Sequence, residues 1–152
     1  MSVLKIDWAL DAPIPFTAAG CKDAGTVHIG NTFAEIAKGE QQIWDGKVPE
    51  KPFVLLAQPS LFDESRAPKG KHTAWAYCHV PAGSDVDMTE RIEAQVERFA
   101  PGFRDRILAR STLGPAVLET LDANLAGGDI NGGIPDVRPA TFRPWPKIAP
   151  YR

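Results

Sequence analysis

The stretch from His72 to Val80 constrains the fold most, because its two alternating sets of side chains differ in kind. One set is aromatic or polar: Thr73, Trp75, Tyr77 and His79. The other set is small and apolar: Ala74, Ala76, Cys78 and Val80. A two-residue period predicts a β-strand, and the small apolar set predicts its core face. We therefore expect the thiol of Cys78 to act as a small hydrophobe rather than as a nucleophile. The aromatic set either packs against a helix or lines an apolar pocket.

Other stretches of the chain have the periods of strands and helices. Further strands are predicted over residues 3–10, 25–30, 53–58 and 108–113. Helices are predicted over residues 32–46, 89–100 and 115–121. Thr32 and Glu35 have the spacing of a capping box. The apolar residues after Thr32 are expected on one helical face: Phe33, Ile36, Ala37, Ile43 and Trp44. Asp87 or Thr89 is expected to cap the next helix.

The order of these elements predicts an α+β domain. Strands joined by mixed connections indicate a mixed, mostly antiparallel sheet with helices packed on one face. We expect this domain to occupy residues 1–125 of the 152-residue chain. Residues 126–152 are rich in glycine and proline and have no regular period, so they are predicted to form an irregular C-terminal tail of the same domain.

Composition and charge exclude several classes of protein. The net charge of −2, without a basic cluster, argues against a nucleic-acid partner. No apolar run approaches the length of a transmembrane helix, and the N-terminus shows no signal-peptide pattern. Two cysteines make no disulfide framework, so the expected location is the cytoplasm. The histidines and cysteines have no metal-binding spacing, and no metal site is predicted.

The glycine cluster of residues 127–133 resembles a phosphate-binding loop only superficially. A dinucleotide fingerprint requires GxGxxG after a strand and at the start of a helix. Here Pro135 and Pro139 follow, and no helix can begin as the motif demands. Two interpretations stay open, because glycine permits both: a tight loop, or a loop that lets the backbone approach a ligand closely.

Several segments, taken in order, resemble one known family. They read KIDWALDAPIP (5–15), AGTVHIG (24–30), GKHTAWAYCHVP (70–81), MTERIEAQVERFAPGFRDRIL (88–108), LAGGDINGG (125–133) and FRP (142–144). This set is similar to the C-terminal half of the phytoene desaturase-like, FAD-dependent oxidoreductases. The resemblance covers nearly the whole chain. It implies that the chain corresponds to the substrate domain, and that the Rossmann-type segment carrying the main FAD-binding motif is absent.

The resemblance also implies where a site would lie. The sheet would form a wall of a cavity for a small apolar substrate, with Trp75 and Tyr77 as substrate-binding candidates. The flavin-proximal candidates are Gly128, Asp129, Asn131, Gly132, Gly133 and Arg143. The catalytic residues stay unassigned. The implied cofactor is FAD and the implied partner is the missing FAD-binding domain or subunit; an apolar face left without that partner predicts self-association.

Two functional hypotheses follow. The first is a substrate-domain fragment of a dehydrogenase or desaturase that uses a flavin and is catalytically incomplete alone. The second is a non-catalytic binding or interaction module that keeps this fold without the cofactor half. The first predicts that a dinucleotide-binding partner restores FAD binding, and the second predicts a partner surface of the chain's own.

Overall fold

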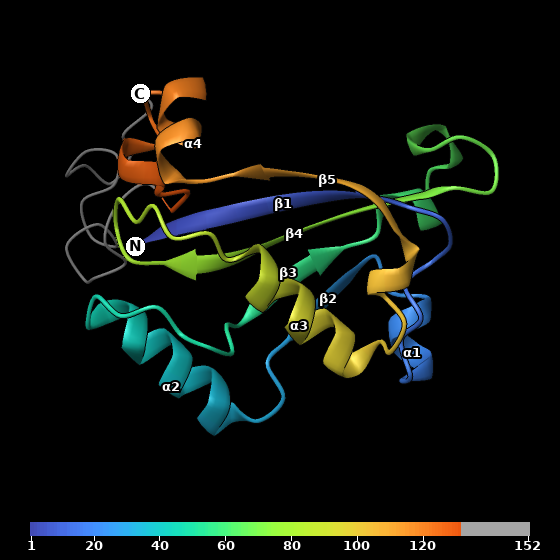
Figure 1. Cartoon of the computed structure of the whole chain (residues 1–152), viewed down its shortest axis with the longest axis horizontal. Helices are drawn as coiled ribbons and strands as arrows, with labels where there is room; N and C mark the ends of the chain where they lie inside the picture. Colours follow the sequence, from blue (N-terminus) through green and yellow to red (C-terminus); the bar gives the residue numbers. More distant parts are fainter. Residues whose placement is uncertain (132–152) are drawn as a thin grey trace, which may run out of the picture.

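A five-stranded antiparallel sheet forms the centre of the computed structural model, which describes residues 1–131 (Figure 1). The strand order is β2-β3-β4-β1-β5. The strands are β1 (Ser2–Leu10), β2 (Thr26–Ile29), β3 (Val54–Ala57), β4 (His72–Val80) and β5 (Ile107–Leu113). Every described pair of strands is antiparallel. The predicted α+β class with a mostly antiparallel sheet is confirmed.

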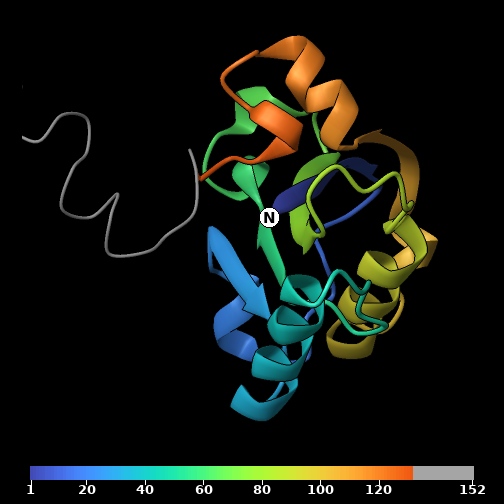
Figure 2. The same cartoon turned by 90° about the vertical axis from the view of Figure 1, so that its left-hand side faces the viewer.

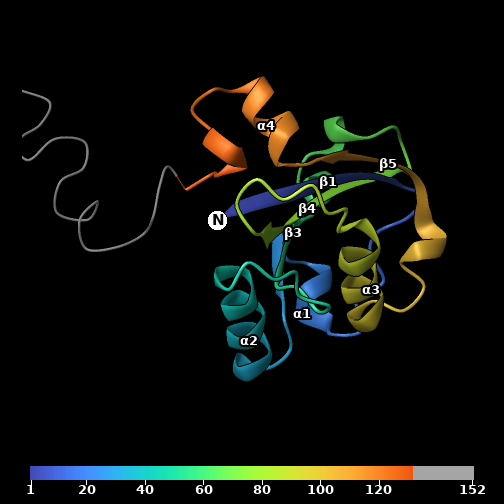
Figure 3. The ribbon, with the colours of Figure 1, turned by 60° about the vertical axis from the view of Figure 1, so that its left-hand side comes forward.

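Three of the four described α-helices lie on one side of the sheet, as Figures 1 and 3 both show. These are α1 (Ala19–Lys22), α2 (Phe33–Trp44) and α3 (Thr89–Phe99). The fourth, α4 (Pro115–Leu121), follows β5 and lies at the end of the sheet where β1 begins. Short 3₁₀ turns complete the described chain: Pro59–Leu61, Glu64–Arg66, Arg104–Arg106 and Ala126–Gly128.

The core lies between the sheet and α3. The core faces of β1 and β4 are buried as the alternation predicts: Leu4, Ile6, Trp8, Leu10, Ala74, Ala76, Cys78 and Val80. Ile92 and Val96 of α3 pack against them. The ring of Phe103 meets Trp8 edge to face, with ring centroids 5.2 Å apart. Burial of these side chains is the main contribution to the stability of the fold.

A charged residue of α3 is also buried in this layer. Glu93 is only 3% exposed, yet its carboxylate accepts three hydrogen bonds. Trp8 Nε1 donates to Oε1 over 3.1 Å, and Arg110 donates through Nε (2.8 Å) and Nη2 (3.3 Å). A buried carboxylate is tolerated only when it is paired and hydrogen-bonded. The network therefore ties α3 to both β1 and β5.

The ends of α2 and α3 differ from the predictions in detail. Thr32 caps α2, since its Oγ1 accepts the backbone N–H of Glu35 over 3.2 Å. The Glu35 carboxylate instead binds Arg98 of α3, at 2.6 and 3.2 Å, so only half of the predicted capping box forms. At α3 the side chain of Asp87 accepts from the N–H of Thr89, although Met88 is the N-cap residue.

The predicted apolar face of α2 is buried only in part: Ile43 is buried and Ile36 half-buried. Phe33 and Trp44 are 88% and 57% exposed, and only Gly39 and Ile43 of this helix are buried. At Gly39 the backbone oxygen of Lys51 lies 3.6 Å from the position that a Cβ atom would occupy, which is ordinary van der Waals contact. The helix therefore packs against the segment that follows it.

Replacing Arg110 with methionine should destabilise the protein by about 2 kcal/mol, because the buried Glu93 carboxylate keeps only the Trp8 donor. Methionine preserves much of the aliphatic packing. The measurement is urea unfolding followed by circular dichroism. The matched control is Arg66→Met, which breaks an exposed pair with Asp63 and should change the free energy of unfolding by less than about 0.5 kcal/mol. Equal effects of the two substitutions would contradict the role of the network.

Candidate functional site

The second face of the sheet is not covered by helices α1, α2 or α3 (Figure 3). Most of its side chains are half-buried or exposed, in contrast to those of the core face: Lys5, Asp7, Ala9, Thr73, Trp75, Tyr77, His79, Ala109 and Ser111. Val3, opposite His79, and Ala57, opposite Trp75, are buried on the same face. We call this surface the open face. Figure 2 shows the strands from the end at which β1 begins. The open face is the candidate site, because it carries the sequence-predicted aromatic residues.

Three rings of β4 form a continuous row on the open face. The rings of Trp75 and Tyr77 are stacked, with centroids 6.4 Å apart and planes 10° apart. The Tyr77 and His79 rings follow at 6.0 Å, with planes tilted by 49°. We call these three residues the aromatic row. The aromatic row gives the open face an apolar surface that a flat apolar molecule can contact.

A charged pair of β1 borders the aromatic row. Lys5 is paired in register with Tyr77, and Asp7 with Trp75. The Lys5 ammonium binds the Asp7 carboxylate and lies 5.8 Å from the centroid of the Trp75 ring. These contacts restrict the Trp75 ring and leave its neighbourhood without net charge.

Glu40 of α2 holds the third member of the row. Its Oε2 lies 2.8 Å from Nδ1 of His79. This contact between a helix and the open face arises because β3 is shorter than β4. The last register pair of β3 is Val54 with Cys78, so His79 lies beyond the end of β3, where α2 can approach. Sequence alternation placed His79 with the aromatic residues, but no signal in the sequence indicated Glu40.

The glycine loop lies at the same end of the sheet as His79. Ser2 is paired in register with Val80, and its hydroxyl donates to the backbone oxygen of Gly127. Gly128 has a φ of +79°, and a Cβ atom there would lie within 2.6 Å of Pro115 Cβ. Of the two interpretations of the glycine cluster, this contact favours a tight loop at Gly128, because the close approach is to the chain itself.

The other predicted flavin-proximal residues are only partly within the described chain. Asp129 accepts the backbone N–H of Asn131 over 2.8 Å, which stabilises the turn after the glycine pair. Gly132, Gly133 and Arg143 lie outside the described residues. The structure therefore brings Trp75 and Tyr77 together. It places the start of the glycine cluster at the end of the sheet where β4 finishes, bound by Ser2 from the core-face set of β1.

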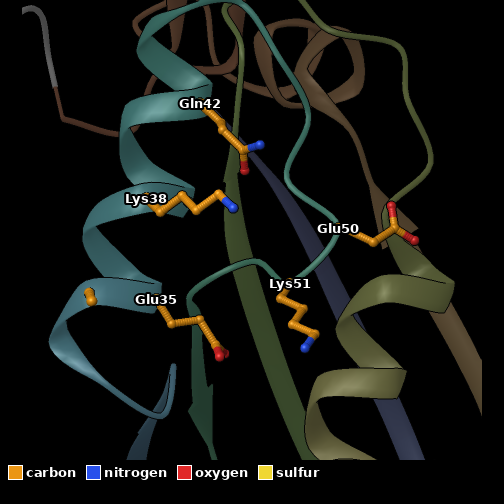
Figure 4. A pocket seen from close by; sticks show the side chains of 7 residues that line it. Glu35, Lys38, Gln42, Glu50 and Lys51 are labelled. Atoms are coloured by element: carbon orange, nitrogen blue, oxygen red, sulfur yellow. The ribbon is translucent and has the colours of Figure 1, made fainter.

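A groove on the helical side has a different character (Figure 4). It has a volume of about 490 Å³ between α2 and the segment around Lys51. Its labelled side chains are charged or polar: Glu35, Lys38, Gln42, Glu50 and Lys51. Arg98 and Arg91 already neutralise its two glutamates. Charged and polar side chains thus surround this groove, whereas aromatic rings form the row on the open face.

The described part of the chain gives little indication of a metal site or of a reactive thiol at Cys78. Residues 1–131 contain no cluster of three or more side chains able to hold a metal ion. Cys78 is buried in the core, and this burial, together with the charge of Glu40, raises the pKa of its thiol to about 12. The interpretation of Cys78 as a small hydrophobe agrees with both observations. No helix within residues 1–131 has the length and apolar character needed to cross a membrane.

Comparison with known proteins relates the chain to oxidoreductases. No family model matches it. Over 144 residues, 87% of the chain, it is 31% identical to the mouse pyridine nucleotide-disulfide oxidoreductase domain-containing protein 2 and 30% identical to the rat protein of that name. Over 123 residues, 76% of the chain, it is 28% identical to 4,4'-diapolycopen-4-al dehydrogenase of Metabacillus indicus. The chain spans 23% of the length of each of these relatives.

Substituting alanine at Gly128 should destabilise the protein by more than about 2 kcal/mol, since the new methyl group would overlap Pro115 in a left-handed backbone conformation. Gly127→Ala is the matched control. Its φ is +62°, but the nearest atom to a Cβ there is 4.0 Å away, so only the backbone cost of about 1 kcal/mol is expected. Thermal unfolding of both variants measures the difference. A loss at Gly128 no greater than at Gly127 would contradict the close packing.

The two cysteines should differ in their reaction with Ellman's reagent. Cys78 is buried and its thiol pKa is raised to about 12, whereas Cys21 is partly exposed. Because the thiolate is the reacting form, one thiol should react in the native protein and two in guanidinium chloride. The Cys21→Ala variant is the control, and it should show almost no reaction before unfolding. Rapid native reaction of this variant would show that Cys78 is accessible.

Proposed function

We propose that this chain is the substrate-side domain of a flavin-dependent oxidoreductase of the phytoene desaturase-like group. In this proposal the open face forms one wall of a cavity for an apolar substrate. A dinucleotide-binding part, on the same polypeptide or on a partner, completes the enzyme. The observation that carries the proposal is the aromatic row, which lies on the sheet face opposite α3.

The sequence relationships support the chemistry. The relatives are an oxidoreductase domain-containing protein and a dehydrogenase whose name gives an apolar aldehyde as its substrate. Proteins with pyridine nucleotide-disulfide oxidoreductase domains typically depend on a flavin. The ordered motifs of the sequence are similar to the same broad class, which supports assigning the aromatic row to a substrate domain.

The described residues fit one part of FAD better than the other. Trp75 and Tyr77 offer flat surfaces for an isoalloxazine ring or a conjugated substrate. Within residues 1–131 no strand is joined to a helix by the GxGxxG turn that would hold the pyrophosphate. The expected contribution of this chain is therefore contact with the ring and the substrate, while another part binds the dinucleotide.

The proposal assigns separate roles to the flavin and to the residues of this chain. A bound flavin supplies the ability to accept a hydride. The chain's own residues orient the substrate and exclude water. Trp75 and Tyr77 provide the apolar contact, and the Lys5–Asp7 pair fixes the Trp75 ring without adding net charge to the surface. Removal of water strengthens the electrostatic interactions in such a cavity.

The proposal predicts that riboflavin quenches the tryptophan fluorescence of the purified chain with saturation. FAD should bind with similar affinity, because the described residues offer only the ring surface. Tyr77→Ala keeps Trp75 as the reporter and should weaken binding about fivefold, which corresponds to roughly 1 kcal/mol of stacking.

Phe33→Ala is the matched control for this titration. Phe33 is 88% exposed at the first position of α2, and its loss should leave the binding curve unchanged. Linear quenching that is equal in all variants would mean collision without a site. Far tighter binding of FAD than of riboflavin would mean that the chain holds the dinucleotide itself. Either result would overturn the proposed division of the enzyme.

A further inference from the structure

We propose that His79 is the binding site for a hydroxyl group on the ligand of the aromatic row, with Glu40 as the residue that positions it. In this site Nε2 of His79 accepts the hydrogen bond. The ligand class is a flat, apolar molecule that carries a neutral hydroxyl group at one end. This inference rests on the proposed function, since it needs a ligand on the open face.

The hydrogen bond to Glu40 determines which ring nitrogen can accept. A carboxylate accepts hydrogen bonds and cannot donate them. Because Glu40 Oε2 lies 2.8 Å from Nδ1 of His79, Nδ1 must carry the hydrogen atom. In the neutral imidazole Nε2 then has the lone pair. Within residues 1–131, Nε2 makes no hydrogen bond, so its lone pair is available to a ligand.

The surroundings hold this pair in place. The side chains of His79 and Glu40 are only 18% and 26% exposed. Oε1 of Glu40 is buried and has no hydrogen-bond partner within residues 1–131. His79 is the hydrogen-bond partner of Glu40 there, and Arg91 of α3 instead binds Glu50 at 2.9 Å. The imidazole is thus the hydrogen-bond donor available to a sheltered carboxylate, which favours a fixed ring orientation.

The position of His79 selects the class of ligand. Its ring lies 6.0 Å from that of Tyr77, so a molecule stacked on Tyr77 can present a substituent to His79. The lone pair of Nε2 requires a donor, which favours a hydroxyl group over an ether or a carbonyl group. The nearby Glu40 carboxylate disfavours an anionic end, such as a carboxylate, by charge repulsion.

The test compares three flat probes that differ at one group. These are 2-naphthol, its methyl ether 2-methoxynaphthalene, and the anion 2-naphthoate. Binding to the full chain is measured by fluorescence titration at neutral pH. We expect 2-naphthol to bind about tenfold more tightly than the methyl ether, as one well-placed hydrogen bond allows. We expect 2-naphthoate to bind more weakly than either.

Two variants test whether His79 causes the preference for the hydroxyl group. His79→Phe should bind both neutral probes with equal affinity, because it keeps a ring and removes the acceptor. His28→Phe is the matched control, since His28 is an exposed histidine on the same face of the sheet but on β2, two strands from Tyr77, and it should keep the tenfold preference. Equal binding of the neutral probes to the unmodified chain would overturn the hydroxyl site and leave the proposed surface intact. Failure of all three probes to bind would overturn both proposals.

A measurement on the unmodified chain makes the test independent of variant folding. Nitrogen-15 NMR of the three histidines identifies which ring nitrogen carries hydrogen. We expect His79 to carry it on Nδ1, in contrast to exposed His28, for which the usual Nε2–H form is expected. An Nε2–H form at His79 would overturn the inference, whatever the probes show.

Discussion

The pairing of β1 with β4 over nine residues is the constraint on which the rest of the structure depends. It runs from Ser2 opposite Val80 to Leu10 opposite His72 and makes these strands the middle of the sheet. A shift of one residue in one strand would move its core set to the outer face. The small apolar set of β4 would then lose its contact with α3, and the aromatic rings would have to enter the core. Register and burial therefore support each other, and the open face exists because this register is fixed.

Much of this arrangement could be predicted from the sequence, because alternation reports directly on burial. The bounds of β4 agree with the prediction, and the separation of Trp75 and Tyr77 from Cys78 follows from the two-residue period alone. The outer face of α2 could not be predicted in the same way. Helical periodicity identifies an apolar side but does not show what will cover it. Here α2 packs at Gly39 against the backbone of Lys51, and Phe33 and Trp44 are exposed.

The contact between Glu40 and His79 was likewise beyond sequence reasoning, because it depends on unequal strand lengths. β3 has four residues and β4 has nine, so part of β4 extends past its neighbour. Helix α2 then lies close to the end of β3, where Glu40 contacts His79. Such tertiary pairs have no local pattern, since 39 residues separate the two side chains. For the same reason the contact of Gly128 with Pro115 could not be predicted from the sequence. It requires the turn that brings the glycine pair back to α4.

The two faces of β4 also bear on how a protein of this kind can change over generations. Even-numbered residues from Ala74 to Val80 lie in the core, while odd-numbered residues from Thr73 to His79 lie on the open face. Selection for folding acts on the first set, and selection for the proposed ligand recognition would act on the second. Because neighbouring residues point in opposite directions, a new specificity can arise on the open face without repacking the core. The residues on the two faces of this one strand can therefore vary nearly independently of each other.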